Sequence, residues 1–413
     1  MKVTAKIPSV KKLEIEVRPN ITVGKLKRLV CERLGLEPDL TKILLDGEPL
    51  KENTPLSKYR KRSLNFEVDY LWSRQLILWD IRGQAALNRS KVLIAGAGAV
   101  GNEVAKNLAM LGVGRLTIVD YDTVEVSNLS RMIFFSKEDS GKPKSTVLAE
   151  ALHRKYPHIE VTAIQGRLEN IPLKTFLESD VILSSLDNFA SRAFLTSISR
   201  RYMVPMVDAG VMGYQCRVQS YIPPNDPCLA CPIPPNQYGR MLGLRNPCDA
   251  PVEDAKVPSL STSISLVASL QSHEAVKIIL GYRTYLEEGR WPEATGEPIR
   301  GIWIADIKHN KYSIVKLSRN RECVICGEHG EAKDTVMRLD VPLKIFESTS
   351  QERVFKEILP DFEEMHIFKL SRFGVIPIGD VKSLKKELRR GDYLRVTFKR
   401  RGGEYNEAIV RLI

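Results

Sequence analysis

Three glycines have the spacing of a loop that holds phosphate groups: Gly96, Gly98 and Gly101. They follow an apolar stretch that is predicted to be a buried strand, Lys91 to Ala95, and they precede a helical pattern. Glycine leaves the backbone bare, so a phosphate can approach the amide groups at the start of a helix. The run GAGAVG therefore predicts a nucleotide site. A tight strand-to-helix turn without a ligand is the plainer alternative.

Charged residues outside this loop distinguish an ATP site from a site for a nicotinamide cofactor. Asp120 ends the next predicted strand, where a carboxylate can bind a ribose hydroxyl. ATP carries about four negative charges, so its site needs several cations and usually Mg²⁺, unlike that of a nicotinamide cofactor. Arg131, Lys144 and the more distant Arg74 supply cations, and Asp187 can hold the metal. ATP with Mg²⁺ is the predicted ligand, and a nicotinamide-dependent dehydrogenase is the alternative.

Two polar residues near these positions have a second interpretation. Asp122 is predicted to belong to the nucleotide site with Asp120. Asp122 and Asn188 both lie in predicted loops, however, where either side chain could instead bond its own backbone in a turn. We therefore predict Asp187 as the metal ligand and Asn188 as its support.

Four of the seven cysteines form two CxxC pairs about 90 residues apart: Cys228 with Cys231, and Cys323 with Cys326. An odd number of cysteines argues against a disulfide framework, and two such pairs are the ligand set of a tetrahedral structural Zn²⁺. A redox dithiol would account for one pair and not for two. We predict a zinc site, with His329 as a bystander.

The three remaining cysteines differ in their surroundings. Cys31 and Cys216 lie among apolar residues and are predicted to belong to the core. Cys248 lies in a loop rich in Pro and Asp, just before an apolar helix predicted from about Ser261 to Leu280. A loop cysteine near a helix start can have a lowered pKa and act as a nucleophile, so Cys248 is the catalytic candidate, against an incidental exposed thiol.

The middle of the chain must position these residues. Strands and helices alternate there, which predicts a parallel sheet covered by helices. Ligands of such sheets bind at the carboxyl ends of the strands, where the glycine loop, Asp120 and Asp187 all fall. The predicted elements after the glycine loop are helices at 102–111 and 144–156 and strands at 115–120, 161–164 and 181–184.

Two smaller α+β units flank this middle part. Residues 1–69 predict strands at 2–7, 13–17, 43–45 and 64–68, a helix at 23–34 and a turn at Asp46. Residues 332–413 predict a strand from Leu343 to Phe346, helices at 351–359 and 383–390, and strands at 393–398 and 408–412, the last two joined by a turn at 401–403. The second unit has no cluster that suggests chemistry, so recognition is its predicted task.

Composition excludes several classes of protein. The 413 residues are 43% hydrophobic, which is enough to form a core in each of two or three domains. There is neither an apolar run of transmembrane length nor a secretory signal, so we expect a cytoplasmic protein without a membrane partner. The net charge of +12 is spread along the chain, which favours an acidic protein partner over nucleic acid.

Two families are similar to these segments. The stretch KILLDGEPLKENTPL at residues 42–56 resembles the second half of ubiquitin, within a β-grasp unit that runs on to Tyr70 without a free Gly-Gly tail. This unit is predicted to be a docking or regulatory domain. Residues 70–331 resemble the adenylating enzymes that activate ubiquitin-like proteins and the sulfur carriers of molybdopterin and thiamine synthesis. The matching runs are YLWSRQLIL, GAGAVG, DYDTVEVSNLSR, GKPK and LDN.

The second resemblance implies a role for each matched residue. Asp120 would hold the ribose, Asp187 would handle Mg²⁺, and Arg74 would reach the phosphates of a partner subunit. The triphosphate ligands would be Asn128, Arg131 and Lys144. Met132 departs from the Gln that the family commonly has after the arginine. The two CxxC pairs hold zinc in the family. In its ubiquitin-type members a cysteine in the region of Cys248 accepts the activated glycine as a thioester, and in some sulfur-carrier members it has a persulfide-related role.

The predicted architecture is α/β, with a Rossmann-like adenylation domain (70–331) between two β-grasp-like α+β domains (1–69 and 332–413). The predicted function is ATP-dependent adenylation of the Gly-Gly tail of a ubiquitin-like protein, then a thioester on Cys248 for transfer to a conjugating enzyme. A sulfur-carrier adenylyltransferase without conjugation is the alternative, and an inactive scaffold is a further one. One set of nucleotide motifs predicts a homodimer with two sites.

Overall fold

The computed structural model describes residues 2–59, 63–243, 258–344, 351–359, 362–371, 374–378, 388–400 and 405–413. The chain divides into two compact units. The first consists of residues 1–90, 108–115 and 276–297, and the second of residues 91–107, 116–275 and 298–413. The predicted domain boundaries stay predictions.

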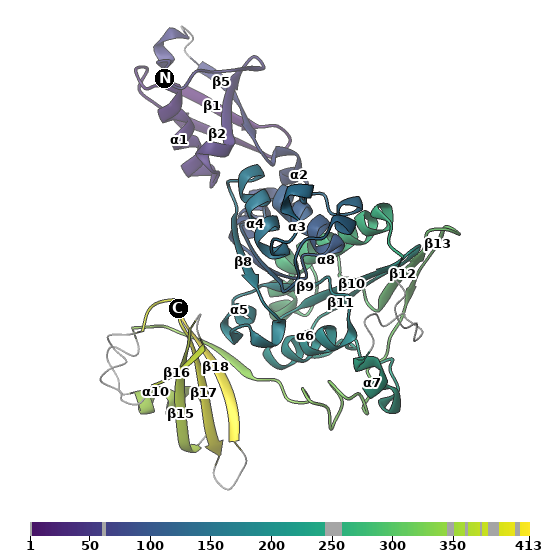
Figure 1. The fold of residues 1–413 in the computed structure, drawn as a ribbon. Coiled ribbons are helices and arrows are strands. Elements are labelled where there is room, and N and C mark those ends of the chain that lie inside the picture. Colours follow the sequence, from purple (N-terminus) through teal and green to yellow (C-terminus); the bar gives the residue numbers. More distant parts are fainter. Residues whose placement is uncertain are drawn as a thin grey trace. The chain divides into compact units, whose positions relative to one another are not determined.

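The first unit begins with a five-stranded sheet in the order β2-β1-β5-β3-β4, in which β1 and β5 are parallel (Figure 1). Its elements are β1 (Lys2–Ile7), β2 (Lys11–Glu16), α1 (Val23–Leu34), β3 (Thr41–Leu45), β4 (Glu48–Pro49) and β5 (Ser63–Tyr70). Alternate residues of β1 and β5 are buried with one side of α1, as an amphipathic sheet and helix require. Thr22 caps α1, and Gly35 ends it in the left-handed conformation. The predicted β-grasp elements are all present.

Helix α2 (Ser73–Arg89) follows this sheet and is attached to it by polar contacts. The Asn88 amide donates to the Glu37 carboxylate (2.9 Å), which also accepts from the Tyr70 hydroxyl. The indole of Trp72 donates to the carbonyl of Met110 (2.8 Å) in the last turn of α3. These contacts connect the β-grasp sheet to the helix that carries Arg74.

The second unit contains an eight-stranded sheet in the order β13-β12-β11-β10-β9-β6-β7-β8 (Figure 1). Its strands are β6 (Lys91–Ala95), β7 (Arg115–Asp120), β8 (Glu160–Gln165), β9 (Val181–Ser184), β10 (Met206–Met212), β11 (Gln215–Tyr221), β12 (Ile302–Asp306) and β13 (Lys311–Val315). Its helices are α3 (Ala99–Leu111), α4 (Lys144–Lys155), α5 (Leu173–Leu177), α6 (Phe189–Tyr202), α7 (Pro235–Leu242) and α8 (Ser261–Glu288). Helices α3 and α8 begin in this unit and end in the first one.

The order of these strands places the candidate residues at one edge. β6 pairs in parallel with β9, and β9 pairs in parallel with β10, so their carboxyl ends meet. β6 and β9 are almost entirely apolar and buried, as expected for strands covered on both faces. The antiparallel strands β11, β12 and β13 extend the sheet beyond the strands predicted from alternation with helices. The predicted parallel-containing α/β sheet is confirmed.

The last part of the chain forms another five-stranded sheet, in the order β14-β18-β17-β15-β16. Its elements are β14 (Met337–Val341), α10 (Gln351–Ile358), β15 (Phe362–Ser371), β16 (Gly374–Pro377), β17 (Tyr393–Arg400) and β18 (Tyr405–Leu412). α10, β17 and β18 were predicted with bounds that differ by a few residues, whereas β15 and β16 were not predicted. The turn predicted at residues 401–403 lies outside the described residues.

Two predictions for this sheet need correction. The first strand runs over Met337–Val341. Of the strand predicted from Leu343 to Phe346, residues 343 and 344 lie in a turn and residues 345 and 346 lie outside the described residues. The observed strand pairs in parallel with β18, from Met337 opposite Ala408 to Val341 opposite Leu412. Its apolar and polar residues alternate, which explains why this segment forms the strand. The helix predicted at 383–390 lies mostly outside the described residues, and its last three residues, 388–390, are not helical.

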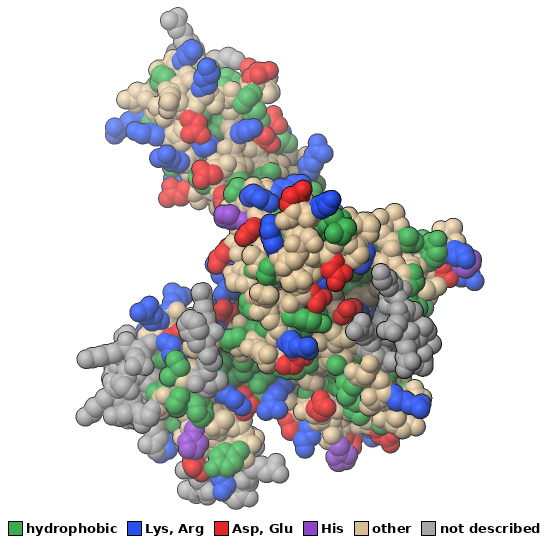
Figure 2. Space-filling model, in the orientation of Figure 1, with side chains coloured by type: hydrophobic (Ala, Val, Ile, Leu, Met, Phe, Trp, Pro, Cys, Tyr) green, Lys and Arg blue, Asp and Glu red, His purple; other side chains and the backbone are tan. Residues whose placement is uncertain are grey.

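The surface carries charges of both signs. Figure 2 shows Lys and Arg side chains interspersed with Asp and Glu side chains over the face that it draws. Among the described residues, no helix is both long and apolar enough to span a membrane.

Candidate functional site

The glycine loop connects β6 to α3 and needs bare backbone at two of its three glycines. Gly96 has a φ of 98°, and a Cβ there would lie 2.6 Å from the carbonyl oxygen of Ser185. A Cβ on Gly101 would lie 1.9 Å from the carbonyl oxygen of Gly96. A Cβ on Gly98 would meet no atom within 4 Å. The loop therefore packs tightly against the end of β9 and leaves open space at Gly98, where a phosphate can approach.

Alanine at these glycines should separate folding from nucleotide binding. We expect Gly101→Ala to lower the free energy of unfolding by about 1–3 kcal/mol, because its Cβ overlaps the Gly96 carbonyl. Gly98→Ala should leave the melting temperature unchanged and weaken ATP binding, because the methyl group occupies the open space. Thermal melting and ATP titration of both variants test this. Equal melting temperatures for Gly101→Ala and wild type would contradict the packing described.

Asp120 lies at the carboxyl end of β7 and ties the glycine loop to this strand. Its carboxylate accepts hydrogen bonds from the amides of Ala97 (2.6 Å) and Asp122 (2.8 Å). Burial raises the pKa of Asp120, and these two amides oppose the rise. Each carboxylate oxygen has a further lone pair, so the group retains the capacity to accept a ribose hydroxyl.

Lys144 and Asp122 meet next to this carboxylate. The Lys144 ammonium lies 2.9 Å from the Asp122 carboxylate, and the Lys144 side chain is only 11% exposed. Backbone hydrogen bonds bring the two segments together, because the Val124 amide donates to Lys142 and the Gly141 amide donates to Val124. The GKPK turn thus places a nearly buried cation at the first position of α4, beside the end of β7.

Asn128 and Arg131 lie in a short 3₁₀ turn that their own side chains stabilise. The Asn128 amide oxygen accepts from the Glu125 backbone (3.0 Å), and an Arg131 Nη donates to the Ser127 carbonyl (2.8 Å). Asn128 is buried, and Arg131 is partly exposed. The predicted triphosphate contacts of both residues stay predictions. Met132, where the resembling family commonly has Gln, is 5% exposed, so an apolar residue suits the position.

Asn102 is a residue of this region that the sequence reasoning missed. It is fully buried in α3, and its amide oxygen accepts from the Phe134 backbone (3.1 Å). This bond fixes the segment after Arg131 to the helix that the glycine loop opens. A polar residue directly after the last glycine of the loop was the signal that could have identified it.

Asp187 follows β9, and its side chain is exposed at the edge where the glycine loop lies. Asn188 caps α6, because its side-chain oxygen accepts from the Ser191 amide (2.8 Å), and its Nδ2 donates to Asp187 (3.3 Å). Asn188 thus bonds the local backbone, as the alternative interpretation had it, and also contacts Asp187; its support of a metal ligand stays a prediction. One exposed carboxylate at a strand end fits Mg²⁺, which usually takes one or two carboxylates together with substrate phosphates.

Two predicted catalytic residues do not belong to the described part of the unit that forms this edge. Arg74 is exposed on α2 in the first unit. Cys248 lies outside the described residues. The roles of both stay predictions.

The four paired cysteines meet in a buried cluster. Their Sγ atoms all lie within 4.8 Å of one another, with Cys228 3.5 Å from Cys323 and Cys231 3.4 Å from Cys326. Four thiolates around one Zn²⁺ at about 2.3 Å would be separated by about 3.8 Å. The cluster therefore fits a tetrahedral zinc ion, and His329 is exposed outside it.

The two other described cysteines are buried in the core, as predicted. Cys31 is fully buried on α1 and Cys216 is 4% exposed on β11. Burial raises the pKa of Cys216 to about 11, and it raises the pKa of Cys31 as well. Neither thiol is a nucleophile at neutral pH.

Comparison with known proteins decides the family. Residues 72–325, more than half of the chain, match the model of the ThiF family. The chain belongs to the ThiF family. Residues 2–66, ahead of the ThiF-family region, match the model of the ubiquitin family.

Relatives of this chain include adenylyltransferases named for molybdopterin synthase and for a sulfur carrier protein. The molybdopterin-synthase adenylyltransferase of Escherichia coli is 31% identical over 62% of this chain and 96% of its own length. The sulfur carrier protein ThiS adenylyltransferase of the same organism is 32% identical over 62% and 94%. An E1-like ubiquitin-activating enzyme of Saccharomyces cerevisiae is 33% identical, but over only 35% of this chain and 23% of its own length. This chain is therefore an adenylyltransferase.

Solved structures support the fold. The chain superposes on the crystal structure of E. coli MccB with ATP with a TM-score of 0.51, at 20% identity, over 63% of this chain and 75% of that one.

Proposed function

We propose that this protein adenylates the C-terminal glycine of a ubiquitin-like protein with ATP. The observation that supports this most is the assembly of the glycine loop, Asp120, the Lys144–Asp122 pair and Asp187 at the carboxyl ends of adjacent strands. Relatives named for a sulfur carrier or for ubiquitin support the class of substrate.

The chemistry needs little acid–base catalysis. The carboxylate of the substrate tail is already a nucleophile, and it attacks the α-phosphorus of ATP while pyrophosphate leaves. Catalysis is then mainly positioning and charge neutralisation. Asp120 binds the ribose, Lys144 neutralises the phosphates, and Asp187 holds Mg²⁺, which reduces the repulsion between the two anions when bound.

Two residues complete the proposed site from elsewhere. Arg131 directly follows the 3₁₀ turn Val126–Ser130 and binds the triphosphate, and Asn128 holds this turn in place. Arg74 reaches the phosphates of a partner subunit, which requires a homodimer. The cysteine cluster holds a structural zinc ion.

ATP–pyrophosphate exchange with candidate Gly-Gly proteins tests the activity. Exchange should require Mg²⁺ and the intact glycine tail of the added protein. Exchange at the same rate with a tail-truncated protein would contradict the proposal, and nicotinamide binding without Mg²⁺ would favour a dehydrogenase.

The fate of the adenylate distinguishes a conjugating enzyme from a sulfur-carrier enzyme. We propose that Cys248 attacks the acyl adenylate, releasing AMP and forming a thioester that passes to a conjugating enzyme. Cys248→Ala should then abolish a DTT-sensitive adduct on a non-reducing gel, while pyrophosphate exchange persists. Cys216→Ala is the matched control, because this thiol is buried. Wild-type protein that shows exchange and no adduct would favour the sulfur-carrier alternative.

A further inference from the structure

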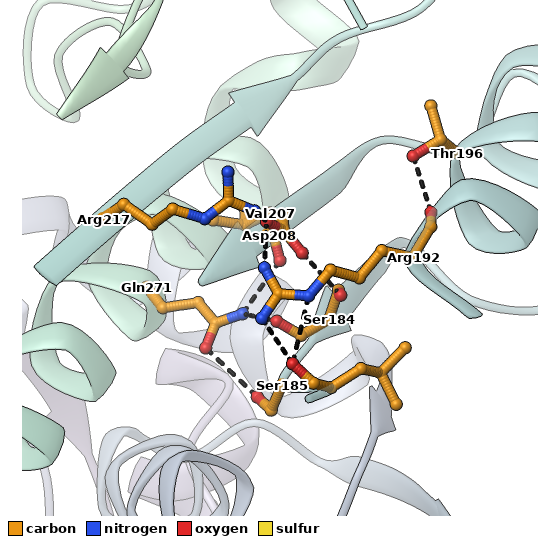
Figure 3. Close-up of polar contacts among 9 residues, drawn as sticks. Ser184, Ser185, Arg192, Thr196, Val207, Asp208, Arg217 and Gln271 are labelled. Carbon is orange, nitrogen blue, oxygen red and sulfur yellow. Dashed lines mark hydrogen bonds and ion pairs between the residues drawn. The ribbon is translucent and has the colours of Figure 1, made fainter. Parts of the chain in front are cut away.

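A buried network of charged side chains lies beside the end of β9 (Figure 3). At its centre is Asp208 on β10, whose side chain is 2% exposed. Its carboxylate accepts from the Ser184 hydroxyl (2.7 Å), from Nη1 of Arg192 (3.1 Å) and from Arg217. A buried carboxylate is costly unless it is paired and hydrogen-bonded, and these three donors meet that need. Asp208 is thus a fixed anchor at the edge that carries the candidate site.

Arg192 connects this anchor to the backbone next to Asp187. It lies on α6 and is 2% exposed. While its Nη1 binds Asp208, its Nε (3.0 Å) and Nη2 both donate to the carbonyl of Leu186. The planar guanidinium of Arg192 therefore bonds the buried Asp208 carboxylate and the Leu186 carbonyl at the same time, and Leu186 directly precedes the predicted metal ligand Asp187.

Gln271 on α8 restrains the same strand end from a different element. Its Nε2 donates to the carbonyls of Ser184 (3.0 Å) and Val207 (2.8 Å), and its Oε1 accepts from the Ser185 hydroxyl (3.3 Å). Residues 184–186 are thus held by α6 and α8 together, whereas the Asp187 side chain is exposed toward a ligand. Such a restraint would be unnecessary for an ordinary surface loop.

We infer that Arg192 is a positioning residue that fixes Asp187 for Mg²⁺ through the Leu186 carbonyl, with Asp208 as its anchor. The inference rests on the proposed function, since it needs Asp187 to hold Mg²⁺. Lysine at this position would keep a positive charge near Asp208 but cannot make the two hydrogen bonds to Leu186 at the same time. Arg192→Lys therefore separates positioning of Asp187 from neutralisation of Asp208.

The test measures pyrophosphate exchange against Mg²⁺ concentration. It also measures, without turnover, the affinity of the protein for Mn²⁺ in the presence of a non-hydrolysable ATP analogue, which Arg192→Lys should lower. Arg192→Lys should lower kcat about tenfold or more and raise the Mg²⁺ concentration for half-maximal exchange. The KM for ATP should change by less than about twofold, because Arg192 is only 2% exposed and is therefore not available to contact the nucleotide directly. Arg200→Lys is the matched control. Arg200 is buried on the same helix, but it donates to the carbonyls of Pro224 and Lys333. It should alter the melting temperature without moving the Mg²⁺ curve.

A double-mutant cycle with Asp187→Asn tests whether Arg192 acts through Asp187. Adding Arg192→Lys to Asp187→Asn should reduce the exchange rate little further. Fully additive losses in the double variant would overturn the inference, and so would an unchanged Mg²⁺ dependence in Arg192→Lys alone. Should Arg192→Lys fail to fold, Asp208→Asn gives the same test. Asparagine keeps one oxygen that can accept a hydrogen bond but lacks the negative charge that holds Arg192 in place. Wild-type protein without Mg²⁺-dependent exchange would refute the proposed function instead.

Discussion

Replacing Lys144 by alanine should reduce pyrophosphate exchange by about a hundredfold or more. The Lys144 ammonium is nearly buried at the start of α4 and lies 2.9 Å from the Asp122 carboxylate, beside Asp120. A cation held in place before the reaction needs no reorganisation when charge moves to the leaving pyrophosphate, so its loss lowers kcat directly. The measurement is exchange at saturating ATP and Mg²⁺.

Lys142→Ala is the matched control for this substitution. Lys142 lies two residues earlier, is 56% exposed and pairs with Asp139 on the surface. Surface pairs contribute little, so both exchange and melting temperature should stay close to wild type. If the two variants lost exchange equally, the effect would come from the GKPK turn and not from the Lys144 charge.

The sequence was sufficient to predict the nucleotide edge of the sheet, for a physical reason. The contacts that build this edge are local: a strand, a glycine turn and a helix follow one another, and Asp120 ends the neighbouring strand. Backbone sterics at Gly96 and Gly101 leave few alternatives to glycine. The cysteine cluster was equally predictable, because two CxxC pairs supply the four ligands of a tetrahedral zinc site, and the site requires the two pairs to lie together in the fold.

The contacts that sequence reasoning missed join residues far apart in the chain. Arg192 and Asp208 are 16 residues apart, and Gln271 and Ser184 are 87 apart. Without the strand order, a lone Arg or Gln on a helix is indistinguishable from a solvated side chain. The first strand of the C-terminal sheet was misplaced for a related reason, because its position depends on the parallel pairing of Met337–Val341 with β18.

Loss of the predicted zinc ion should have the largest effect on stability. The cysteine cluster packs with Phe189, Tyr221 and Tyr238 in one buried core, so the metal would hold together segments near residues 228, 323 and the start of α6. Structural zinc sites contribute about 10–16 kcal/mol of apparent binding free energy in peptides, and even a third of this would be a large share of the stability of a domain. We expect Cys228→Ser to remove the zinc and to lower the melting temperature by about 10 °C or more.

Metal analysis and thermal melting check this prediction together. Wild-type protein should contain one zinc ion per chain, and a strong chelator should reproduce the melting temperature of Cys228→Ser. Cys216→Ala is the control, because this cysteine is equally buried and lies outside the cluster; it should keep the zinc. Phe189 directly follows Asn188, the cap of α6, so zinc loss should also reduce exchange by displacing Asp187. Full stability and exchange in a zinc-free Cys228→Ser variant would show that the four thiols need no metal to hold this core.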